Sequence, residues 1–556
     1  MNLLENINWV FNSSETLGEI YNVPSESTFN FYIEHPKNGK LIKKFLPSIG
    51  QKDQEPPFNK IHKDDPQTFT NIRLNKILYF PQFYSNFSFI FDQDSLDFII
   101  SQTGLGLRIS VQGIKNVKVF FENNGKVKKF STPFNIFLRV FENGSIEYEH
   151  SYQKSEDADF DFSPEAFSVL WNLSLDSNKT PFVPVSKGWV KFISEIHKVP
   201  PTGSLIFNWD QAFASIIVAK HFPELGQYLV EQLTDLIDEK GFSPQLIVNS
   251  FSSQISNPPI LFLTVAYNYL INKNIDFLKI CFPKLLNILN WWETNRKVTW
   301  NDHLYTWGGS TAFEAGLESG WDNSPLWERM TFDEKAGRFS FACPMATGFI
   351  LLANRILEIL SSPKILNKTE EYNRLREKRK QIINAIEENM WSKELEAYLP
   401  VDENGCHLGT IFPGIYYPGF TGEINPERFK KSLKHLNDQN VLGGDFLIPT
   451  LSRSDPDFNG DGDYWRGRIW PPVNFLTTAA IANYSKIEAN KILESSKSIF
   501  KKNFSNGISG ENYSSVSGNL FAQPGVYSRN CPVYVWGGLL ALNPISIFNL
   551  LHINTK

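Results

Sequence analysis

The chain has 556 residues, more than one ordinary hydrophobic core organises, so two or three domains are expected unless one is a large closed fold. Hydrophobic residues make up 42% and charged residues 20% of the composition, which is typical of a globular protein. The formal net charge of −5 argues against a nucleic-acid binder that tracks phosphates, because such proteins usually carry a basic excess.

The cysteines and the N-terminus exclude further classes. The four cysteines are far apart and form no Cys-x-x-Cys pair, so they predict neither a disulfide framework nor a zinc site. The first ten residues lack a basic region followed by an apolar run, and no signal peptide is visible. No run of 18 apolar residues is present, so no membrane span is expected. The expected location is the cytoplasm.

Residues 1–155 are predicted to form an N-terminal antiparallel β-sandwich-like domain. Short aromatic or β-branched runs occur at 87–91, 107–112, 117–122, 136–141 and 146–150. Asn124-Gly125 and Asn143-Gly144 stand between such runs, and Asn-Gly is the strongest short hairpin signal. The polar, Pro-containing segment 51–67 is predicted to be a long loop.

The hydrophobic period changes after about residue 163, and residues 156–556 are predicted to be mainly α-helical. About ten to twelve helices are expected from apolar stripes. The stripes include Tyr228, Leu229, Leu233, Leu236 and Ile237, and the segments 260–271, 285–292, 347–360, 370–390, 487–500 and 536–551. Helices alternating with long Gly-, Pro- and Trp-rich loops fit an α/α toroid. An α-solenoid is disfavoured because no repeat of fixed period is found.

The segment 317–325, Leu-Glu-Ser-Gly-Trp-Asp-Asn-Ser-Pro, is the most informative stretch for function. Its turn residues present the carboxylates of Glu318 and Asp322 on a loop. Trp321 offers a flat apolar face for a sugar ring and a dry wall that raises a carboxyl pKa. Glycoside cleavage needs two carboxyl groups, and Asp322 is the first candidate. Glu318 is its rival, which composition alone does not exclude, and a surface loop with solvated acids is the alternative.

The second carboxyl is predicted in segment 507–515, Gly-Ile-Ser-Gly-Glu-Asn-Tyr-Ser-Ser. Glu511 stands there beside turn residues and Tyr513. The segment 535–542, Val-Trp-Gly-Gly-Leu-Leu-Ala-Leu, follows and contains Trp536. Glu511 is the candidate base, and a helix cap or a solvated charge is its alternative role.

The segment 463–474, Asp-Tyr-Trp-Arg-Gly-Arg-Ile-Trp-Pro-Pro-Val-Asn, forms a third constellation. Arg466 offers a planar set of donors for sugar hydroxyls or a carboxylate. Trp465 and Trp470 are candidates for stacking on a sugar ring. Packing over the following helix is the alternative for one of them, and Trp465 is preferred as the contact.

Two segments lie upstream of the segment 317–325, which is called the acid loop below. In 207–213, Phe-Asn-Trp-Asp-Gln-Ala-Phe, Asp210 has the possible role of a helix N-cap. In 256–259, Ser-Asn-Pro-Pro, Asn257 precedes two prolines.

Taken in order, these segments resemble glycoside hydrolase family 63, a relative of the trehalases. The resemblance extends over well over half the chain, and Asn257 stands where the family has Gln. It implies an (α/α)6 toroid in residues 156–556. It also implies an inverting, exo-acting hydrolase that removes α-linked glucose or mannose from a small glycoside or oligosaccharide. Asp322 would be the acid and Glu511 the base, about 6.5–9.5 Å apart. The implied substrate-binding residues are Trp209, Asp210, Asn257, Trp321, Trp465, Arg466, Trp470, Tyr513 and Trp536.

Segment 455–463 looks like the start of a calcium loop, but the twelfth position is Arg466, where an EF-hand needs a Glu. A structural calcium held by some of these acids stays an alternative, although the chemistry itself requires no metal. The expected partner is a small carbohydrate, with no nucleic acid and no membrane. The alternatives from other classes are a catalytically inactive carbohydrate-binding protein and a helical interaction scaffold. A trehalase-like hydrolase is disfavoured, since Glu-Asn-Tyr stands where trehalases have Glu-Lys-Tyr.

Overall fold

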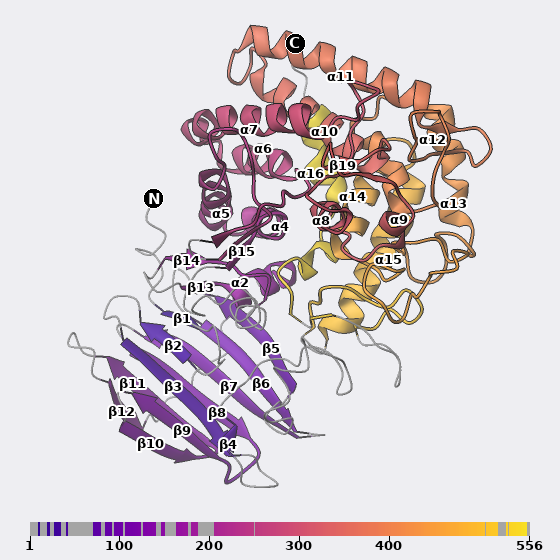
Figure 1. Cartoon of the computed structure of the whole chain (residues 1–556). Helices are drawn as coiled ribbons and strands as arrows, with labels where there is room; N and C mark the ends of the chain where they lie inside the picture. The colour runs from indigo at the N-terminus through magenta and orange to yellow at the C-terminus, as the bar shows by residue number, and fades with distance from the viewer. Residues whose placement is uncertain are drawn as a thin grey trace. The chain divides into compact units, whose positions relative to one another are not determined.

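The computed structural model of the chain describes strand segments within residues 9–150 and also residues 163–175, 180–186, 205–248, 251–505, 508–520, 530–531 and 533–552 (Figure 1). It divides into two compact units. The first comprises Met1–Ile206, Lys502–Gly510 and Cys531–Val535, and the second comprises Phe207–Lys501, Glu511–Asn530 and Trp536–Lys556. The predicted domain boundary at residue 155 and the predicted loop 51–67 lie outside the described residues.

The first unit contains two six-stranded antiparallel sheets (Figure 1). One has the order β1-β2-β3-β9-β10, with β4 paired to β3. Its strands are β1 (Trp9–Phe11), β2 (Glu19–Asn22), β3 (Ser27–Glu34), β4 (Leu41–Ile42), β9 (Lys118–Asn123) and β10 (Lys126–Ser131). The other has the order β12-β11-β8-β7-β6-β5. Its strands are β5 (Asn71–Leu78), β6 (Tyr84–Phe91), β7 (Asp94–Thr103), β8 (Gly106–Gly113), β11 (Phe134–Val140) and β12 (Ile146–His150).

Alternation of side chains along these strands explains how the sheets meet. Leu96, Phe98 and Ile100 of β7 are buried, and their neighbours along the strand are less so. Phe121 of β9 contacts Phe134 of β11 with ring centroids 6.2 Å apart, so an apolar face of each sheet covers the other. The described strands of the first unit therefore pair as antiparallel sheets.

Both predicted hairpins are present as strand pairs. Asn123 lies opposite Lys126, which leaves Asn124-Gly125 as a two-residue connection between β9 and β10. Val140 lies opposite Ile146, so Asn143-Gly144 falls in the connection between β11 and β12. The residues of both connections are outside the described part of the chain.

The second unit is mainly helical. Its longer helices are α4 (Asn208–Ala219), α5 (Pro223–Asp235), α6 (Leu261–Asn272), α7 (Ile275–Asn295), α10 (Pro344–Ser361), α11 (Thr369–Asn389), α14 (Pro471–Ala482) and α15 (Lys486–Phe504). Shorter pieces are α8 (Ala312–Glu318), α9 (Pro325–Glu328), η3 (Pro413–Thr421), α12 (Pro426–Ser432), α13 (Lys434–Asn437), η4 (Gly537–Leu540), α16 (Pro544–Phe548) and η5 (Asn549–His552).

Six of these elements contact one another in a closed cycle. The helix α4 contacts α6, α6 contacts α10, and α10 contacts η3. The cycle continues through α14 and η4, and η4 contacts α4 again. An open α-solenoid would not return its last element to its first, because each repeat contacts only its neighbours. The predicted mainly helical, closed arrangement is therefore confirmed, and the solenoid alternative is wrong.

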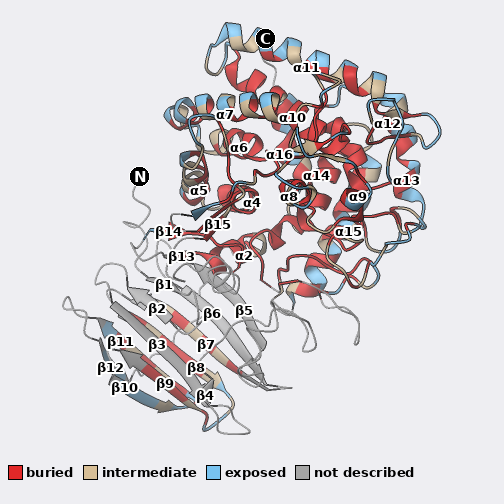
Figure 2. Cartoon of the chain, in the orientation of Figure 1, coloured by how far each residue is buried: buried red, intermediate tan, exposed pale blue. Residues whose placement is uncertain are grey.

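The burial pattern separates inner from outer helices (Figure 2). Every residue of α4 is buried, whereas α11, which packs along α10, is buried along one stripe only. Helix α10 is the one helix in the described residues that is long and apolar enough to cross a membrane, and 94% of it is buried inside the fold. Its apolar side chains therefore pack inside the helical unit.

The predicted helix over 536–551 is wrong as a single element. The segment forms η4, α16 and η5 instead. Asn543 accepts a hydrogen bond from the Ile545 amide and Pro544 begins α16, so a new helix starts there rather than continuing from Trp536.

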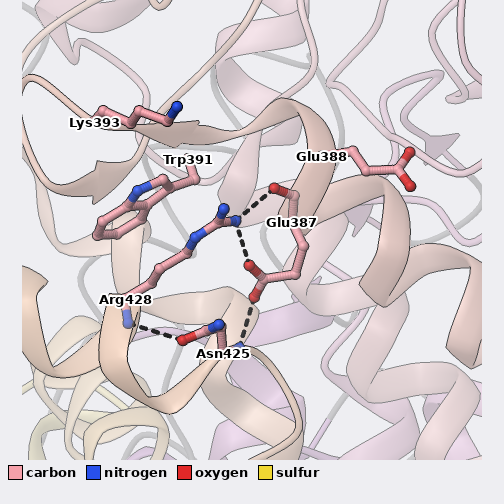
Figure 3. A pocket seen from close by; sticks show the side chains of 6 residues that line it. All are labelled: Glu387, Glu388, Trp391, Lys393, Asn425 and Arg428. Atoms are coloured by element: carbon pink, nitrogen blue, oxygen red, sulfur yellow. Dashed lines mark hydrogen bonds and ion pairs between the residues drawn. The ribbon is translucent and has the colours of Figure 1, made fainter.

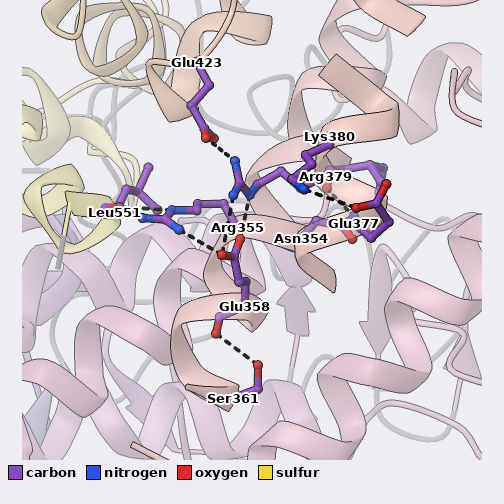
Figure 4. A network of polar contacts seen from close by, with 10 residues as sticks. Asn354, Arg355, Glu358, Ser361, Glu377, Arg379, Lys380, Glu423 and Leu551 are labelled. Carbon is purple, nitrogen blue, oxygen red and sulfur yellow. Dashed lines mark hydrogen bonds and ion pairs between the residues drawn. The ribbon is translucent and has the colours of Figure 1, made fainter. Parts of the chain in front are cut away.

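A buried ionic network fastens three elements of the helical unit (Figure 4). Arg379 of α11 donates to Glu358 of α10 at 2.6 Å and also pairs with Glu423, which follows η3. Arg355 pairs with Glu358 at 3.3 Å and donates to the Leu551 carbonyl of η5 at 2.8 Å. The C-terminal η5 is therefore tied to α10 by charge as well as by apolar packing.

Candidate active site

The acid loop follows α8 and reverses sharply before α9. Gly320 has φ of +75°, a conformation in which a side chain is strained, and a Cβ there would lie 2.7 Å from the Trp209 ring. Glycine is therefore required both for the turn and for the close approach of the indole. The turn leaves Asp322 half-buried, and Pro325 then begins α9.

The centre of the site is the Tyr464 hydroxyl, which donates a 2.8 Å hydrogen bond to Oε1 of Glu511. Burial raises the pKa of the Tyr464 phenol well above its usual value of 10, and nearby negative charges raise it further. Those charges are the carboxylates of Glu511, Asp322 and Asp210. Three of the carboxylates singled out from the sequence thus act on the Tyr464 phenol, and Glu511 is in direct contact with it.

Glu511 is held from two sides. Its side chain is 1% exposed, and its backbone carbonyl accepts a 2.9 Å hydrogen bond from the Trp536 indole. The backbone of Tyr513, two residues on, pairs with that of Ile469 in both directions at 2.8 Å. Glu511 is therefore neither a solvated charge nor a helix cap, and Tyr513 lies buried in a strand-like pairing.

Three of the predicted sugar-contacting tryptophans stack on one another. The Trp465 ring lies 5.4 Å from Trp321 at an interplanar angle of 16°, and 3.6 Å from Trp470 at 10°. Trp465 is 1% exposed. The preference for Trp465 as a free platform is not supported by this packing, because neighbouring indoles already cover its ring. Trp209 and Trp536 meet edge to face at 5.5 Å beside this stack.

Arg466 is engaged by protein carboxylates. It pairs with Glu328 of α9, lies 3.5 Å from Asp463 and lies 3.9 Å from Asp457. Its guanidinium therefore connects the acid loop region to the segment 455–466, and the open set of donors expected from the sequence is largely occupied.

Arg329 engages two aspartates of the calcium-like segment. Arg329 donates two 2.7 Å hydrogen bonds to the Asp455 carboxylate and also pairs with Asp457. Burial alone would raise the pKa of Asp455, but the Arg329 hydrogen bonds outweigh it and lower that pKa. Among the described residues, no group of three or more His, Cys, Asp or Glu is arranged to hold a metal ion. A guanidinium thus serves as the cation for these aspartates.

Both carboxylate oxygens of Glu318, the alternative acid, accept hydrogen bonds from within the protein. It is 0% exposed, and the Arg296 guanidinium donates to both of its oxygens at 2.7 to 2.9 Å. The Gly308 amide donates to it at 2.6 Å. Burial raises the pKa of the Glu318 carboxyl, and the Arg296 charge opposes that rise. Its lone pairs have no vacancy for a substrate.

The two upstream candidates differ in their placement. Asp210 is the third residue of α4 and is buried, and the N-cap position is taken by Phe207, so its predicted alternative role as N-cap is wrong. Asn257 is also buried, and its amide donates a 3.0 Å hydrogen bond to the Ser243 carbonyl. Asn257 therefore braces a neighbouring turn, whereas Asp210 contributes charge to the Tyr464 environment.

Sequence reasoning missed two residues that join the loops. Tyr464 lay inside a segment that was singled out but received no role. Asn323 accepts a 2.9 Å hydrogen bond from the Trp465 amide and donates at 3.0 Å to Asp463. These partners are about 140 residues apart in sequence, so no local pattern signals the contact.

The family model of the mannosylglycerate hydrolase MGH1-like glycoside hydrolase domain matches residues 204–530. A probable mannosyl-oligosaccharide glucosidase from Schizosaccharomyces pombe is 29% identical over 229 residues, 38% of this chain and 26% of that protein. The mannosyl-oligosaccharide glucosidase of Saccharomyces cerevisiae is 22% identical over 285 residues, 44% of this chain and 33% of that protein. The chain therefore matches a third or less of the length of these curated relatives.

Among solved structures, the GH63 mannosylglycerate hydrolase from Thermus thermophilus in complex with glucose aligns with a TM-score of 0.51 and 18% identity. The alignment covers 62% of this chain and 93% of that one, and it establishes a shared fold. Since the family model spans well over half of the chain, the protein belongs to the MGH1-like glycoside hydrolases and is a glycoside hydrolase of the family 63 type.

Proposed function

We propose that this protein is an inverting, exo-acting α-glycoside hydrolase that removes glucose or mannose from a small glycoside or oligosaccharide. Asp322 is the general acid and Glu511 the general base. The observation that carries this proposal is the hydrogen bond from the Tyr464 hydroxyl to Glu511, and the effect of the Asp322 and Asp210 charges on the same phenol supports it. The engagement of Glu318 by Arg296 supports Asp322 as the acid, because Glu318 has no free position for a glycosidic oxygen.

The chemistry needs two proton transfers on opposite faces of the sugar. Asp322, protonated, gives its proton to the glycosidic oxygen as the bond to the anomeric carbon breaks. Glu511, ionised, takes a proton from a water whose oxygen attacks that carbon from the other face. The Tyr464 hydroxyl orients the Glu511 carboxylate, and its raised pKa keeps it a donor at working pH. Each proton is accounted for by one carboxyl, so the reaction written in this way requires no metal.

Three further features belong to this proposal. The closed cycle of α4, α6, α10, η3, α14 and η4 is the inner ring of an (α/α)6 toroid, with the loops that carry the carboxylates gathered at one end. Asp210 accepts hydrogen bonds from sugar hydroxyls. The proposed location is the cytoplasm.

The sugar class is drawn from the names of similar proteins. The Thermus thermophilus protein is a mannosylglycerate hydrolase, and the two yeast proteins are named as mannosyl-oligosaccharide glucosidases. Because this chain matches only part of those glucosidases, both glucosides and mannosides are candidate substrates.

The experiment is a hydrolysis screen of α-glucosides and α-mannosides, including glycerate conjugates, with NMR detection of the newly released anomer. The variants Asp322→Asn and Glu511→Gln serve as controls. Release of the β-sugar, lost in both variants, is expected. Release of the α-sugar would overturn the assignment of Glu511 as a water-activating base, and binding without turnover would favour an inactive carbohydrate-binding protein.

A further inference from the structure

A hollow of about 540 Å³ opens on the helical unit, where the end of α11 meets the start of α12 (Figure 3). Its volume lies within the range of about 300–1,000 Å³ typical of small-molecule sites. It is lined by Glu387, Glu388, Trp391, Lys393, Asn425 and Arg428. None of these six residues belongs to the candidate active site.

The floor of the hollow is preorganised. The Glu387 carboxylate accepts hydrogen bonds from the Tyr398 hydroxyl at 2.8 Å and the Asn425 amide at 2.6 Å. Arg428 donates to the same carboxylate and to the Glu387 carbonyl, both at 2.7 Å. The Arg428 guanidinium also lies 5.7 Å from the centre of the Trp391 ring. These contacts hold an indole and a guanidinium in place before any ligand arrives.

The Trp391 ring also contacts the Tyr398 ring, with centroids 5.0 Å apart, but the polar groups of three lining residues are unengaged. Within the described part of the chain, the Trp391 indole N–H, the Lys393 ammonium and the Glu388 carboxylate have no hydrogen bond or ion pair. The hollow therefore offers an apolar ring, two free donors and a free acceptor. The lining contains two carboxylates and two cations, so its net charge is zero, which disfavours a phosphate or another multivalent anion.

An apolar ring bordered by both donors and acceptors matches a neutral polyhydroxylated molecule. We propose that this hollow is a second carbohydrate-binding site, which holds a gluco- or manno-oligosaccharide apart from the active site. Trp391 covers one face of a sugar ring, Glu388 accepts hydrogen bonds from hydroxyls, and Lys393 donates to them. The choice of sugar rests on the proposed function. Occupancy of the site would raise the concentration of oligosaccharide at the enzyme.

The test measures binding by calorimetry on the full chain carrying Asp322→Asn, with an α-linked glucotetraose and an α-linked mannotetraose as probes. Trp391→Ala is compared with Tyr372→Ala, an aromatic substitution near the start of the same α11. One of the probes is expected to bind at two sites in the parent and in Tyr372→Ala. Trp391→Ala is expected to keep one site and to weaken the other by about tenfold or more. With Asp322 restored, hydrolysis of a small glycoside should be unchanged by Trp391→Ala.

Binding that is the same in Trp391→Ala and in the parent, whatever the number of events, would overturn the proposal. If Trp391→Ala does not fold, Glu388→Ala and Lys393→Ala, both at exposed positions, carry the same test. A failure of the proposed function is seen separately, as the absence of hydrolysis by the chain with Asp322 restored, and a binding event that Trp391→Ala weakens but Tyr372→Ala does not would still support a sugar site in the hollow.

Discussion

The Tyr464 hydroxyl and the Glu511 carboxylate meet at 2.8 Å across 47 residues of sequence. Tyr464 has φ of +42°, in the left-handed region that residues other than glycine rarely adopt. Such a conformation costs about 1–3 kcal/mol and persists only where the surroundings impose it. Here the Trp470 indole donates to the Tyr464 carbonyl at 3.1 Å, which helps to hold that backbone and aim the phenol at Glu511.

Tyr464→Phe should lower kcat by about 10- to 100-fold, because a hydrogen bond to a charged group contributes about 1.5–3 kcal/mol. The phenylalanine ring keeps its edge-on contact with Trp470, so Tm should change little. The measurement is steady-state kinetics on the substrate found in the screen. Tyr484→Phe removes a partly buried hydroxyl that accepts a hydrogen bond from the Ile424 backbone amide and should leave kcat unchanged. Equal losses in both variants would contradict a role for Tyr464 at the base.

Glu318→Gln and Asp322→Asn should have opposite effects. Glu318→Gln breaks a buried ion pair with Arg296 and should lower the free energy of unfolding by about 3–5 kcal/mol. The folded fraction should retain turnover. Asp322→Asn should lower kcat by at least about 100-fold while leaving Tm close to the parent's. Thermal melts and kinetics on both variants decide this, and a reversed pattern would make Glu318 the acid.

Much of the fold follows from local sequence patterns. The Asn-Gly pairs marked two hairpins, and the stripe at Tyr228–Ile237 marked α5, because periodicity and turn chemistry act over a few residues. The break at Asn543-Pro544 shows the limit. An apolar run continues past it, and only the cap and the proline decide that a new helix starts.

The site was predictable in composition but not in connectivity. Asp322 and Glu511 stood out because carboxylates beside glycine and tryptophan are unusual outside functional loops. The stacking of Trp465 on Trp321 and the pairing of Arg466 with Glu328 could not be predicted, since these partners lie more than 130 residues apart in sequence. Whether a polar side chain is open to ligand or already occupied depends on such distant partners.

Removal of divalent cations should leave the parent's Tm unchanged, because Arg329 already neutralises Asp455 and Asp457. Arg329→Ala should lower Tm, since it leaves the buried Asp455 carboxylate unpaired. Calcium should then raise the Tm of this variant but not of the parent, because the freed oxygens are ligands that calcium prefers. Melting curves with chelator and with calcium test this. A fall in the parent's Tm with chelator would show instead that the parent binds a structural metal ion.

Arg379→Met should destabilise the helical unit by about 3–5 kcal/mol, because it leaves Glu358 buried without its main partner. Arg374→Met is the matched control on the same helix, where Arg374 pairs with Glu371 on the surface at 3.0 Å. That change should cost no more than about 1 kcal/mol. Urea unfolding of both variants measures the difference, and equal midpoints would show that the buried network adds nothing to stability.

Stability should fall as pH rises above 10. Burial raises the pKa of Tyr416, Tyr417 and Tyr484 well above the usual 10. Below pH 10 these groups are protonated in both states and make no difference to stability. Above it the unfolded chain releases their protons while the folded chain retains them, so unfolding gains up to about 1.4 kcal/mol per group and pH unit. Tm measured against pH should therefore decline from pH 10 upward, and Tyr417→Phe should make the decline shallower. Tyrosinate absorbance should rise together with loss of helical circular dichroism. The appearance of the full tyrosinate signal in a still-helical protein would show that these hydroxyls ionise inside the fold.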